Sequence, residues 1–417
     1  MKNSGVEWIG EIPEDWEVSK IGQLYEERRT KVSDTVYPPL SVTMQGILPQ
    51  LETAAKSDAH DDRKLVLKGD FAINSRSDRR GSCGISEHDG SVSLINTVLH
   101  PKTEMNPIYY NWLFHSFRFS DEYYKNGHGI VDDLWTTSWS EMKRIFIPLP
   151  PKSIQQHIAS YLDKKCSKIE ETIQNQQQVI EKLKTYKQSL ITEAVTGKIK
   201  IQNGKVCGKY ENYKDSGVEW IGKIPSEWEV SKFGRFAQVK SNLVDPNLYL
   251  EYPQIAPDNI GKGSGKLIDW QTVKDSGVIS WNHLFFKGQI VYSKIRPTLN
   301  KLIIAPFDGL CSADMYPIET NIHKQFFVYM MLSQYFVEQV GLITRDRVKM
   351  PKINQNELSG ILITVPTKEE QKEISDYLDK KCTAIDTAIE QKQKLIEKLT
   401  EYKKSLVYEC VTGKKEI

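Results

Sequence analysis

Three clusters of lysine and arginine have the residue types and spacing that bind phosphate groups or the edges of bases. Their local charges are +4 in residues 63–80 and +3 in both 294–301 and 343–352. Lys and Arg on loops suit phosphate contacts, and Arg can also bind guanine through two hydrogen bonds. A run of charge is usually only a solvated surface, but the first two clusters follow the same kind of glycine turn in the two halves of the chain. The candidate DNA-contact residues are Arg76, Arg79, Arg80, Lys294, Arg296, Lys301, Arg345, Arg347 and Lys349.

Motifs for catalysis or metal binding are missing or have a simpler explanation. Asn-Pro-Ile-Tyr at 106–109 is similar to the Asn-Pro-Pro-Tyr loop with which amino-methyltransferases hold a flipped base, but the second proline is absent. An Asn N-cap with Pro at the first helical position explains the same letters. The Gly-rich stretch 261–265 lacks the Gly-Lys-Ser/Thr ending of a phosphate loop, so we interpret it as a turn. We therefore predict no catalytic residue, no metal site and no bound cofactor in this chain.

The composition predicts a soluble, cytoplasmic protein. The chain has 417 residues and a net charge of +2, and it lacks the run of about 18 apolar residues that a membrane helix needs. Its six cysteines are scattered without a Cys-x-x-Cys pair, which indicates reduced thiols. Because the charges nearly balance, a nucleic-acid partner would have to be held by local basic patches.

One phrase of 17 residues occurs twice. Ser4–Lys20 and Ser216–Lys232 are identical at 14 of 17 positions. We expect the large aromatic residues of the phrase to pin each half of the chain to a helix end, with a surface for a partner protein as the alternative. These framework residues are Trp8, Trp16, Trp220 and Trp228.

Two long segments, which repeat at a distance of 216 residues, are predicted to form helices. Apolar residues recur at alternating intervals of three and four, which is the spacing of a coiled-coil seam. Gly197 and Gly413 supply the left-handed residue that ends each helix, and Ser153 and Thr367 each begin a possible capping box. A helix packed only on its own domain's core is the alternative. The predicted helix-pairing residues are Leu162, Ile169, Ile173, Gln176, Ile180, Leu183, Leu190, Leu378, Ile385, Ile389, Lys392, Ile396, Leu399 and Leu406.

We predict that the two helices pair antiparallel, because the two halves of the chain would then be related by a pseudo-twofold axis. A polar pair inside the apolar seam lowers stability but can fix register and orientation. The predicted neighbours are Gln176 with Lys392 at the centre, Leu183 with Ile385, and Ile169 with Leu399.

The inserts 21–150 and 233–365 mix short apolar runs with turn residues. Residues 64–76 and 283–296 each predict a strand, a glycine turn and a second strand. Elsewhere the two inserts share almost no sequence, so the framework is kept while the inserts have diverged. Helices with an Asn cap are predicted at 106–117 and 321–336.

These features predict an α+β protein with two globular α/β domains joined by two long antiparallel helices, and with an internal pseudo-twofold repeat. The predicted segments are a first domain at 1–150, a central helix at 151–200, a second domain at 201–365, and a C-terminal helix at 366–417 that pairs with the central helix.

The repeated phrase, the Ile-Pro-Leu-Pro-Pro-x-x-x-Gln sequence before the first long helix and the Tyr-Leu-Asp … Val-Thr-Gly-Lys helices resemble the specificity subunit of type I restriction-modification systems. The resemblance covers the whole chain, in order, twice. It implies two target-recognition domains, each reading one half of a split, asymmetric site in double-stranded DNA, and helices that dock two methyltransferase subunits. Those partners would bind S-adenosylmethionine and methylate adenine, and a motor-nuclease (restriction) subunit would join for cleavage. The specificity subunit itself would be non-catalytic.

The first insert departs from the second at one point. It has Gly-Ile-Val-Asp-Asp-Leu-Trp at 129–135, where the second insert has the loop with Arg345 and Arg347. Asp132 or Asp133 could accept a hydrogen bond from cytosine N4, but we favour a surface turn.

Two other classes of protein remain open. A coiled-coil scaffold that binds only proteins predicts no salt-sensitive DNA affinity, and a fragment of a single-chain methylase-specificity enzyme is opposed by the missing cofactor motifs.

Overall fold

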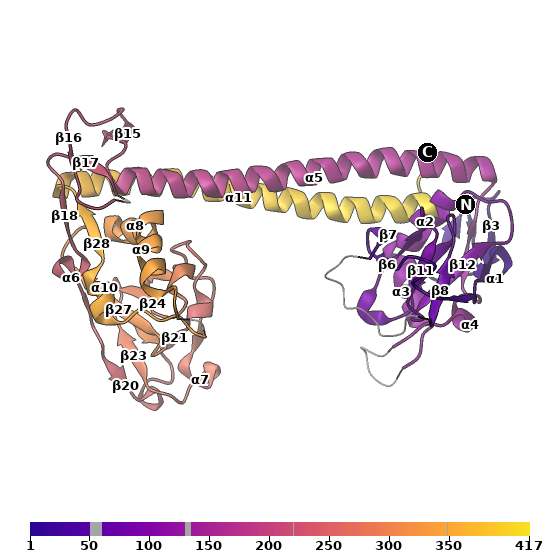
Figure 1. Ribbon diagram of the computed structural model, residues 1–417, viewed down its shortest axis with the longest axis horizontal. Helices are drawn as coiled ribbons and strands as arrows, with labels where there is room; N and C mark the ends of the chain where they lie inside the picture. Colours follow the sequence, from indigo (N-terminus) through magenta and orange to yellow (C-terminus); the bar gives the residue numbers. More distant parts are fainter. Residues whose placement is uncertain (51–60, 130–134, 220, 348) are drawn as a thin grey trace. The chain divides into compact units, whose positions relative to one another are not determined.

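The chain folds as two compact units. A computed structural model describes all residues except 51–60, 130–134, 220 and 348. Unit 1 consists of Met1–Gln177 and Gln393–Ile417, and unit 2 of Gln178–Lys392. Each unit therefore holds one insert and about one half of each long helix (Figure 1). The prediction instead treated each long helix as a whole, separate segment of the chain.

The two long helices are α5 (Lys152–Val195) and α11 (Lys368–Val411), and they are antiparallel. The same ion pair joins them in both units. In unit 2 Lys187 Nζ lies 2.7 Å from Asp386 Oδ1, and in unit 1 Lys403 pairs with Glu170. Lys187 and Lys403 are 216 residues apart, as are Glu170 and Asp386, so each repeat supplies one lysine and one acid.

The ion pairs do not by themselves define the helix register, because a lysine side chain is long enough to reach a partner about one turn along the facing helix. The predicted pairing places Lys187 opposite Lys381, and its ion-pair partner Asp386 lies five residues further along α11. The predicted neighbours Leu183 and Ile385 belong to one apolar cluster of unit 2, and Ile169 and Leu399 belong to one apolar cluster of unit 1. The central pair of Gln176 and Lys392 belongs to different units and stays a prediction.

The ends of the long helices follow the sequence signals with one exception. Gly197 (φ +68°) and Gly413 (φ +71°) are left-handed, as predicted. Thr367 forms the predicted capping box, accepting from the backbone N–H of Glu370 while that carboxylate accepts from the N–H of Thr367. The corresponding prediction for Ser153 is wrong, because α5 already begins at Lys152 and places Ser153 inside the helix.

The two inserts share one strand order. Unit 1 has a sheet in the order β10-β9-β12-β4 and a second in the order β11-β8-β5. Unit 2 repeats them as β25-β24-β27-β19 and as β26-β23-β20, the latter extended by β21 and β22. The elements of unit 1 are β1 (Lys2–Asn3), β2 (Glu11–Ile12), β3 (Glu17–Lys20), α1 (Ile21–Leu24), β4 (Tyr25–Glu27), β5 (Lys31–Val32), β6 (Leu40–Thr43), β7 (Gly46–Pro49), β8 (Arg63–Val66), β9 (Phe71–Asn74), the 3-10 helix η1 (Ser77–Arg79), β10 (Cys83–Ile85), β11 (Gly90–Val92), β12 (Asn96–Pro101), α2 (Pro107–His115), α3 (Phe117–Lys125), α4 (Trp139–Met142) and β13 (Phe146–Leu149).

Unit 2 begins with two short strand pairs, β14–β15 and β16–β17, of which the second repeats the pair β1–β2 of unit 1. Among the described residues, no single helix is both long enough and apolar enough to cross a membrane. The helices α8 (Lys324–Leu332) and α9 (Gln334–Thr344) meet these two conditions only when they are taken together as a bent pair. The elements of unit 2 are β14 (Ile201–Gln202), β15 (Lys205–Val206), β16 (Tyr213–Asp215), β17 (Lys223–Pro225), β18 (Glu229–Lys232), α6 (Phe233–Phe236), β19 (Ala237–Val239), β20 (Leu243–Val244), η3 (Pro246–Leu248), β21 (Pro253–Ile255), η4 (Pro257–Asn259), β22 (Gln271–Thr272), α7 (Val273–Ser276), β23 (Asn282–Phe285), β24 (Ile290–Ser293), η5 (Pro297–Leu299), β25 (Leu302–Ile304), β26 (Gly309–Cys311), β27 (Met315–Thr320), α8 (Lys324–Leu332), α9 (Gln334–Thr344), α10 (Gln355–Gly360) and β28 (Leu362–Val365).

The predicted strand–turn–strand segments are present as β8–β9 and β23–β24, with Gly69 and Gly288 at positive φ between them. The two strands of each segment belong to different sheets, so neither segment is a hairpin. Asn106 caps α2 as predicted, accepting from the N–H of Tyr109. The Asn cap predicted at 321 is wrong, because His323 caps α8 and the predicted single helix breaks at Ser333 into α8 and α9.

Each copy of the repeated phrase packs against the end of a long helix in its own unit. A Cβ at Gly413 would lie 2.4 Å from Pro13 Cδ and 3.1 Å from the ring of Trp16. The same substitution at Gly197 would meet Pro225 and Trp228 at 2.4 and 3.2 Å. Only glycine therefore fits at both contacts, since its left-handed φ and the close ring each exclude a side chain.

The lysine that follows each of these glycines closes the contact. Lys198 Nζ donates to the carbonyl oxygens of Ile221 and Lys223 at 2.8 and 2.6 Å. Lys414 Nζ donates to the carbonyl oxygens of Ile9 and Glu11. The helix ends are thus tied to the phrases by duplicated contacts.

Candidate nucleic-acid interface

The inserts are held to the long helices by a second set of duplicated contacts. The side chain of Gln155 accepts from the N–H of Asn106 and donates to the carbonyl of Pro150. Gln371 makes the same two bonds with His323 and Pro366. About two turns further along each helix, Asp163 accepts from the indole of Trp112 at 2.7 Å, and Asp379 accepts from the hydroxyl of Tyr329 at 2.6 Å. These glutamines and aspartates fix where each insert presents its surface.

Three of the four framework tryptophans are described, and all three are buried. Trp16 and Trp228 are 4% and 0% exposed. Trp8 is also buried, and its indole donates to the carbonyl of Phe146 at 3.2 Å. Trp220 lies outside the described residues.

The candidate arginines of the first basic cluster follow β9, at and beside the 3-10 helix η1. Arg79 and Arg80 are 68% and 59% exposed at their side chains, and each lies 3.7 Å from a carboxylate, Asp78 and Asp121 respectively. The Arg80 guanidinium also lies 5.1 Å from the ring centroid of Tyr124. These ion pairs are exposed and therefore weak, so both arginines can exchange their carboxylates for phosphates. A hollow of about 650 Å³ beside them is lined by Ser77, Asp78, Arg80, Asp121, Tyr124, Lys125 and Trp135.

Arg76 lies apart from that hollow. It is half-buried, its backbone N–H donates to the side chain of Asn74 at 3.0 Å, and its main chain pairs with Thr136. Asp132 and Asp133, in the segment that replaces the second insert's arginine loop, lie outside the described residues.

The second cluster is divided by its surroundings. Lys301 is 15% exposed at its side chain, and its Nζ donates to the carbonyl of Pro257 at 2.8 Å. Lys294 lies with its Nζ 5.2 Å from the ring centroid of Tyr316. Arg296 adopts a left-handed backbone (φ +42°) before η5 and is exposed. Lys301 therefore braces its own loop, whereas the other two remain better placed for contacts with a ligand.

The third cluster follows the end of α9. Arg345 is 70% exposed and lies 3.8 Å from Asp346, and Lys349 is exposed. Arg347 is bound to Glu357, and this hydrogen bond lowers the pKa of the Glu357 carboxyl. Arg345 and Lys349 are therefore the more accessible cations of this cluster.

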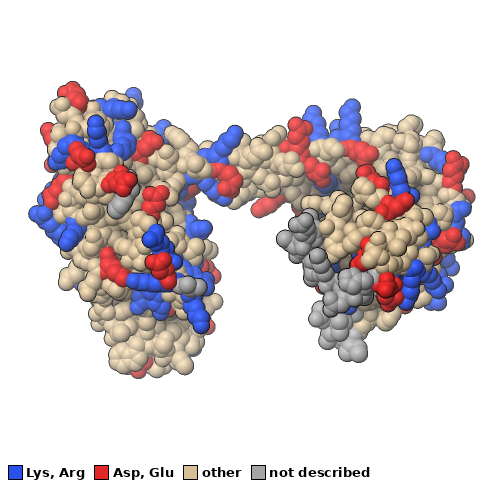
Figure 2. All heavy atoms as spheres, viewed as in Figure 1, with Lys and Arg blue, Asp and Glu red and all other residues tan. Residues whose placement is uncertain are grey.

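Charged side chains of both signs are interspersed over the viewed face of each unit rather than gathered in one basic field (Figure 2). On this face a phosphate backbone would therefore meet separate cationic positions.

A further group of charged residues was missed by the sequence analysis. Glu27, Arg29 and Lys31 follow one another at every second position, and strand pairing places Lys31 beside Lys64. The two acids at 26 and 27 and the basic residues at 28, 29 and 31 nearly cancel, so a count of local charge does not reveal them. The alternation with a period of two was the available signal.

The chain belongs to the family described as the type I restriction modification DNA specificity domain, whose model matches residues 13–182 and 225–400. It is thus a type I specificity subunit with two target-recognition domains, as predicted from the sequence. The EcoDI specificity subunit of Escherichia coli is 28% identical over 97% of this chain and 89% of that protein. The MjaVIII specificity subunit of Methanocaldococcus jannaschii is 26% identical over 97% and 93%.

Two solved structures share the fold. A chain from a structure concerned with complex assembly and conformational transition of the type I R-M system matches with a TM-score of 0.72 and 12% identity, covering 96% of this chain and 98% of the other. The HsdS subunit from Thermoanaerobacter tengcongensis matches with a TM-score of 0.52 and 14% identity, covering 97% and 98%.

Proposed function

We propose that this chain reads a bipartite, asymmetric site in double-stranded DNA through its two inserts and docks two methyltransferase subunits on its repeated framework. The observation that carries the proposal is the contrast, within each unit, between the repeated framework and the insert. Contacts of the framework are duplicated with the same residue types at Gly197 and Gly413, and with equivalent acceptors at Asp163 and Asp379. The inserts keep the strand order but carry different charged residues, as two readers of unlike half-sites would.

Docking of two identical partners is supported by an exposed tyrosine that both long helices carry at the same place. Tyr186 and Tyr402 occupy equivalent positions and are 54% and 52% exposed. The positions just before them, Thr185 and Glu401, are also exposed but differ. A large aromatic side chain left in water at the same place in both copies fits an interface anchor better than it fits a solvated helix face.

In this proposal the chain has no catalytic role. The docked methyltransferase subunits bind S-adenosylmethionine and methylate adenine, restriction subunits join through them, and the complex works in the cytoplasm. The purified chain alone is expected neither to methylate nor to cut DNA, and addition of the methyltransferase subunits is expected to produce adenine methylation, measured by transfer of a labelled methyl group. Methylation or cleavage by the chain shown to be free of partner would overturn this assignment.

The basic clusters are expected to position the DNA backbone. In the assembled complex, Arg76→Ala, Arg79→Ala or Arg345→Ala should weaken binding and reduce the slope of log affinity against log salt by about one unit for each phosphate that is no longer bound. If one of these arginines instead reads a guanine, discrimination at that base should fall by about 1–3 kcal/mol.

Binding titrations at several salt concentrations check this expectation. Lys205→Ala is the control, because Lys205 is an exposed cation on β15 and lies outside both inserts. Unchanged affinity, slope and specificity in all three arginine variants would remove these loops from the DNA interface.

A further inference from the structure

One region of the fold has the same strand pairing in both recognition domains but side chains of different chemistry. Glu27 pairs with Leu99 in unit 1, as Val239 pairs with Ile318 in unit 2. Lys31 pairs with Lys64, as Leu243 pairs with His283. A capping box with a glutamate three residues after the cap borders both places, at Ser138 in α4 and Asn354 in α10.

The equivalent side chains share no charge pattern. From unit 1 to unit 2 the pairs are Glu27 and Val239, Arg29 and Ser241, Lys31 and Leu243, Lys64 and His283, and Trp139 and Gln355. The scaffold is thus retained while each chemically active position has changed. This is the pattern expected where two related domains read different ligands, because specificity depends on the groups presented and not on the backbone beneath them.

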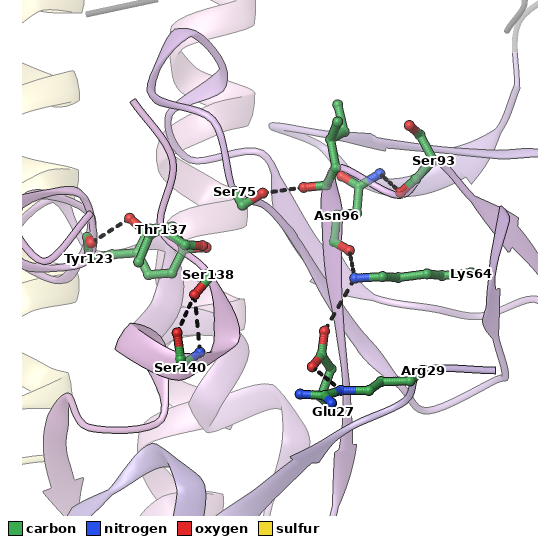
Figure 3. Close-up of polar contacts among 11 residues, drawn as sticks. Glu27, Arg29, Lys64, Ser75, Ser93, Asn96, Tyr123, Thr137, Ser138 and Ser140 are labelled. Atoms are coloured by element: carbon green, nitrogen blue, oxygen red, sulfur yellow. Dashed lines mark hydrogen bonds and ion pairs between the residues drawn. The ribbon is translucent and has the colours of Figure 1, made fainter. Parts of the chain in front are cut away.

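In unit 1 these residues form an ordered chain of contacts (Figure 3). Lys64 Nζ donates to the carbonyl of Asn96 at 2.8 Å and to Glu27 Oε1 at 3.2 Å. Arg29 Nε donates to the other oxygen of the same carboxylate, Glu27 Oε2, at 2.7 Å. Glu27 is 10% exposed and Lys64 16%, whereas Arg29 is 76% exposed. The partly buried lysine and glutamate therefore hold an arginine that projects into solvent.

The contact through Nε leaves the outer edge of the arginine available. Among the described residues, the terminal amino groups of Arg29 have no hydrogen-bond partner. A guanidinium is planar and presents its donors in a rigid fork. Glu27, Arg29, Lys31 and Lys64 line a hollow of about 390 Å³ together with Trp139. An arginine fixed in this way on the rim of a hollow is suited to two parallel hydrogen bonds with the O6 and N7 atoms of guanine.

We propose that Arg29 is a specificity-determining residue of the first recognition domain, binding a guanine edge in its half-site, with Glu27 and Lys64 as positioning residues. The inference rests on the DNA reading assigned above to the inserts. Ser241 and Leu243 occupy the equivalent positions of unit 2 and offer no cation, so the second domain reads a different base at this place. Arg29 thereby contributes to the asymmetry of the site.

The test uses the complex of the full chain with its methyltransferase subunits and a panel of duplexes in which each base pair of the methylated site is changed in turn. Arg29→Ala and Arg29→Lys are both expected to lose about tenfold to a hundredfold discrimination at one G·C pair of one half-site. The other half-site should be read as before. Lysine keeps the charge but lacks the fork, so the pair of variants separates base reading from phosphate binding.

Arg118→Ala is the matched control and should leave discrimination unchanged, because that arginine stacks on Phe117, with its guanidinium 5.2 Å from the ring centroid. Wild-type discrimination by Arg29→Lys, with uniformly weaker binding by Arg29→Ala, would show a phosphate contact and overturn the inference. Unchanged discrimination in both variants would also overturn it. A wild-type complex without any sequence preference would instead overturn the proposed function, and this arm of the experiment keeps the two failures apart.

Discussion

Replacing both Tyr186 and Tyr402 by alanine is expected to weaken binding of both methyltransferase subunits by roughly thirtyfold or more, and each single replacement is expected to weaken binding of one subunit. The two tyrosines lie on different units, at equivalent places of α5 and α11. In unit 2, Tyr186 lies close to Tyr377, whose pKa is raised chiefly by burial and next by Tyr186. Lys381 Nζ lies 5.9 Å from the ring centroid of Tyr377. The exposed ring of Tyr186 therefore lies beside a surface that is partly apolar and partly cationic.

The expected loss is large because an aromatic anchor at the centre of an interface commonly contributes about 2 kcal/mol or more, which is roughly a thirtyfold change in affinity. Native mass spectrometry of the wild type and variants, titrated with purified methyltransferase subunits, measures how many subunits are bound at each concentration. The double variant Thr185→Ala/Glu401→Ala is the control, because it changes the preceding exposed positions, which the repeats do not share. Two subunits bound as tightly to the double tyrosine variant as to the wild type would contradict this anchor. An absence of binding to the wild type would contradict docking itself.

Trp228→Ala is expected to destabilise unit 2 by about 3–5 kcal/mol, the range for removal of a large buried aromatic side chain. The ring is fully buried and packs against Tyr210, with 5.8 Å between ring centroids. Its Nε1 donates to Glu370 at the start of α11 at 3.1 Å. The substitution removes both the packing and this hydrogen bond, where the second phrase, the end of α5 and the start of α11 meet.

Hydrogen exchange followed by mass spectrometry resolves the two units, which a global unfolding curve does not. Protection should fall in peptides from residues 201–392 and change little in those from residues 21–150. Trp281→Ala serves as control, since this side chain is 60% exposed and exposed substitutions usually change stability by less than about 0.5 kcal/mol. Equal protection in Trp228→Ala and Trp281→Ala would show that the duplicated phrase is not an anchor.

The framework could be predicted because it is written twice and because its signals are local. Helix periodicity, a terminal glycine and a cap each depend on residues within a few positions of one another. The prediction failed where local patterns were ambiguous. The apolar run 324–344 shows no periodic interruption at Ser333, where the chain nevertheless breaks into α8 and α9. The ion pair between Lys187 and Asp386 was also not predicted, because it depends on two residues far apart in the chain.

The recognition surfaces were predicted only in part for the same reason. Arg79 and Arg345 belong to clusters that are contiguous in sequence, and local charge is enough to find them. The group formed by Glu27, Arg29 and Lys64 depends on the pairing of β5 with β8, across 37 residues between Glu27 and Lys64. No single-sequence pattern specifies that pairing, and the acids beside these cations conceal them in a charge count.

The central claim, that two unlike domains read the two halves of one site, is tested most directly by mapping methylated adenines across the genome of cells that express this chain with its methyltransferase subunits. The account predicts a single chain-dependent motif made of two different half-sites separated by a gap of fixed length whose bases are not read. A continuous motif, a palindromic motif, or methylation that is the same with and without this chain would contradict it.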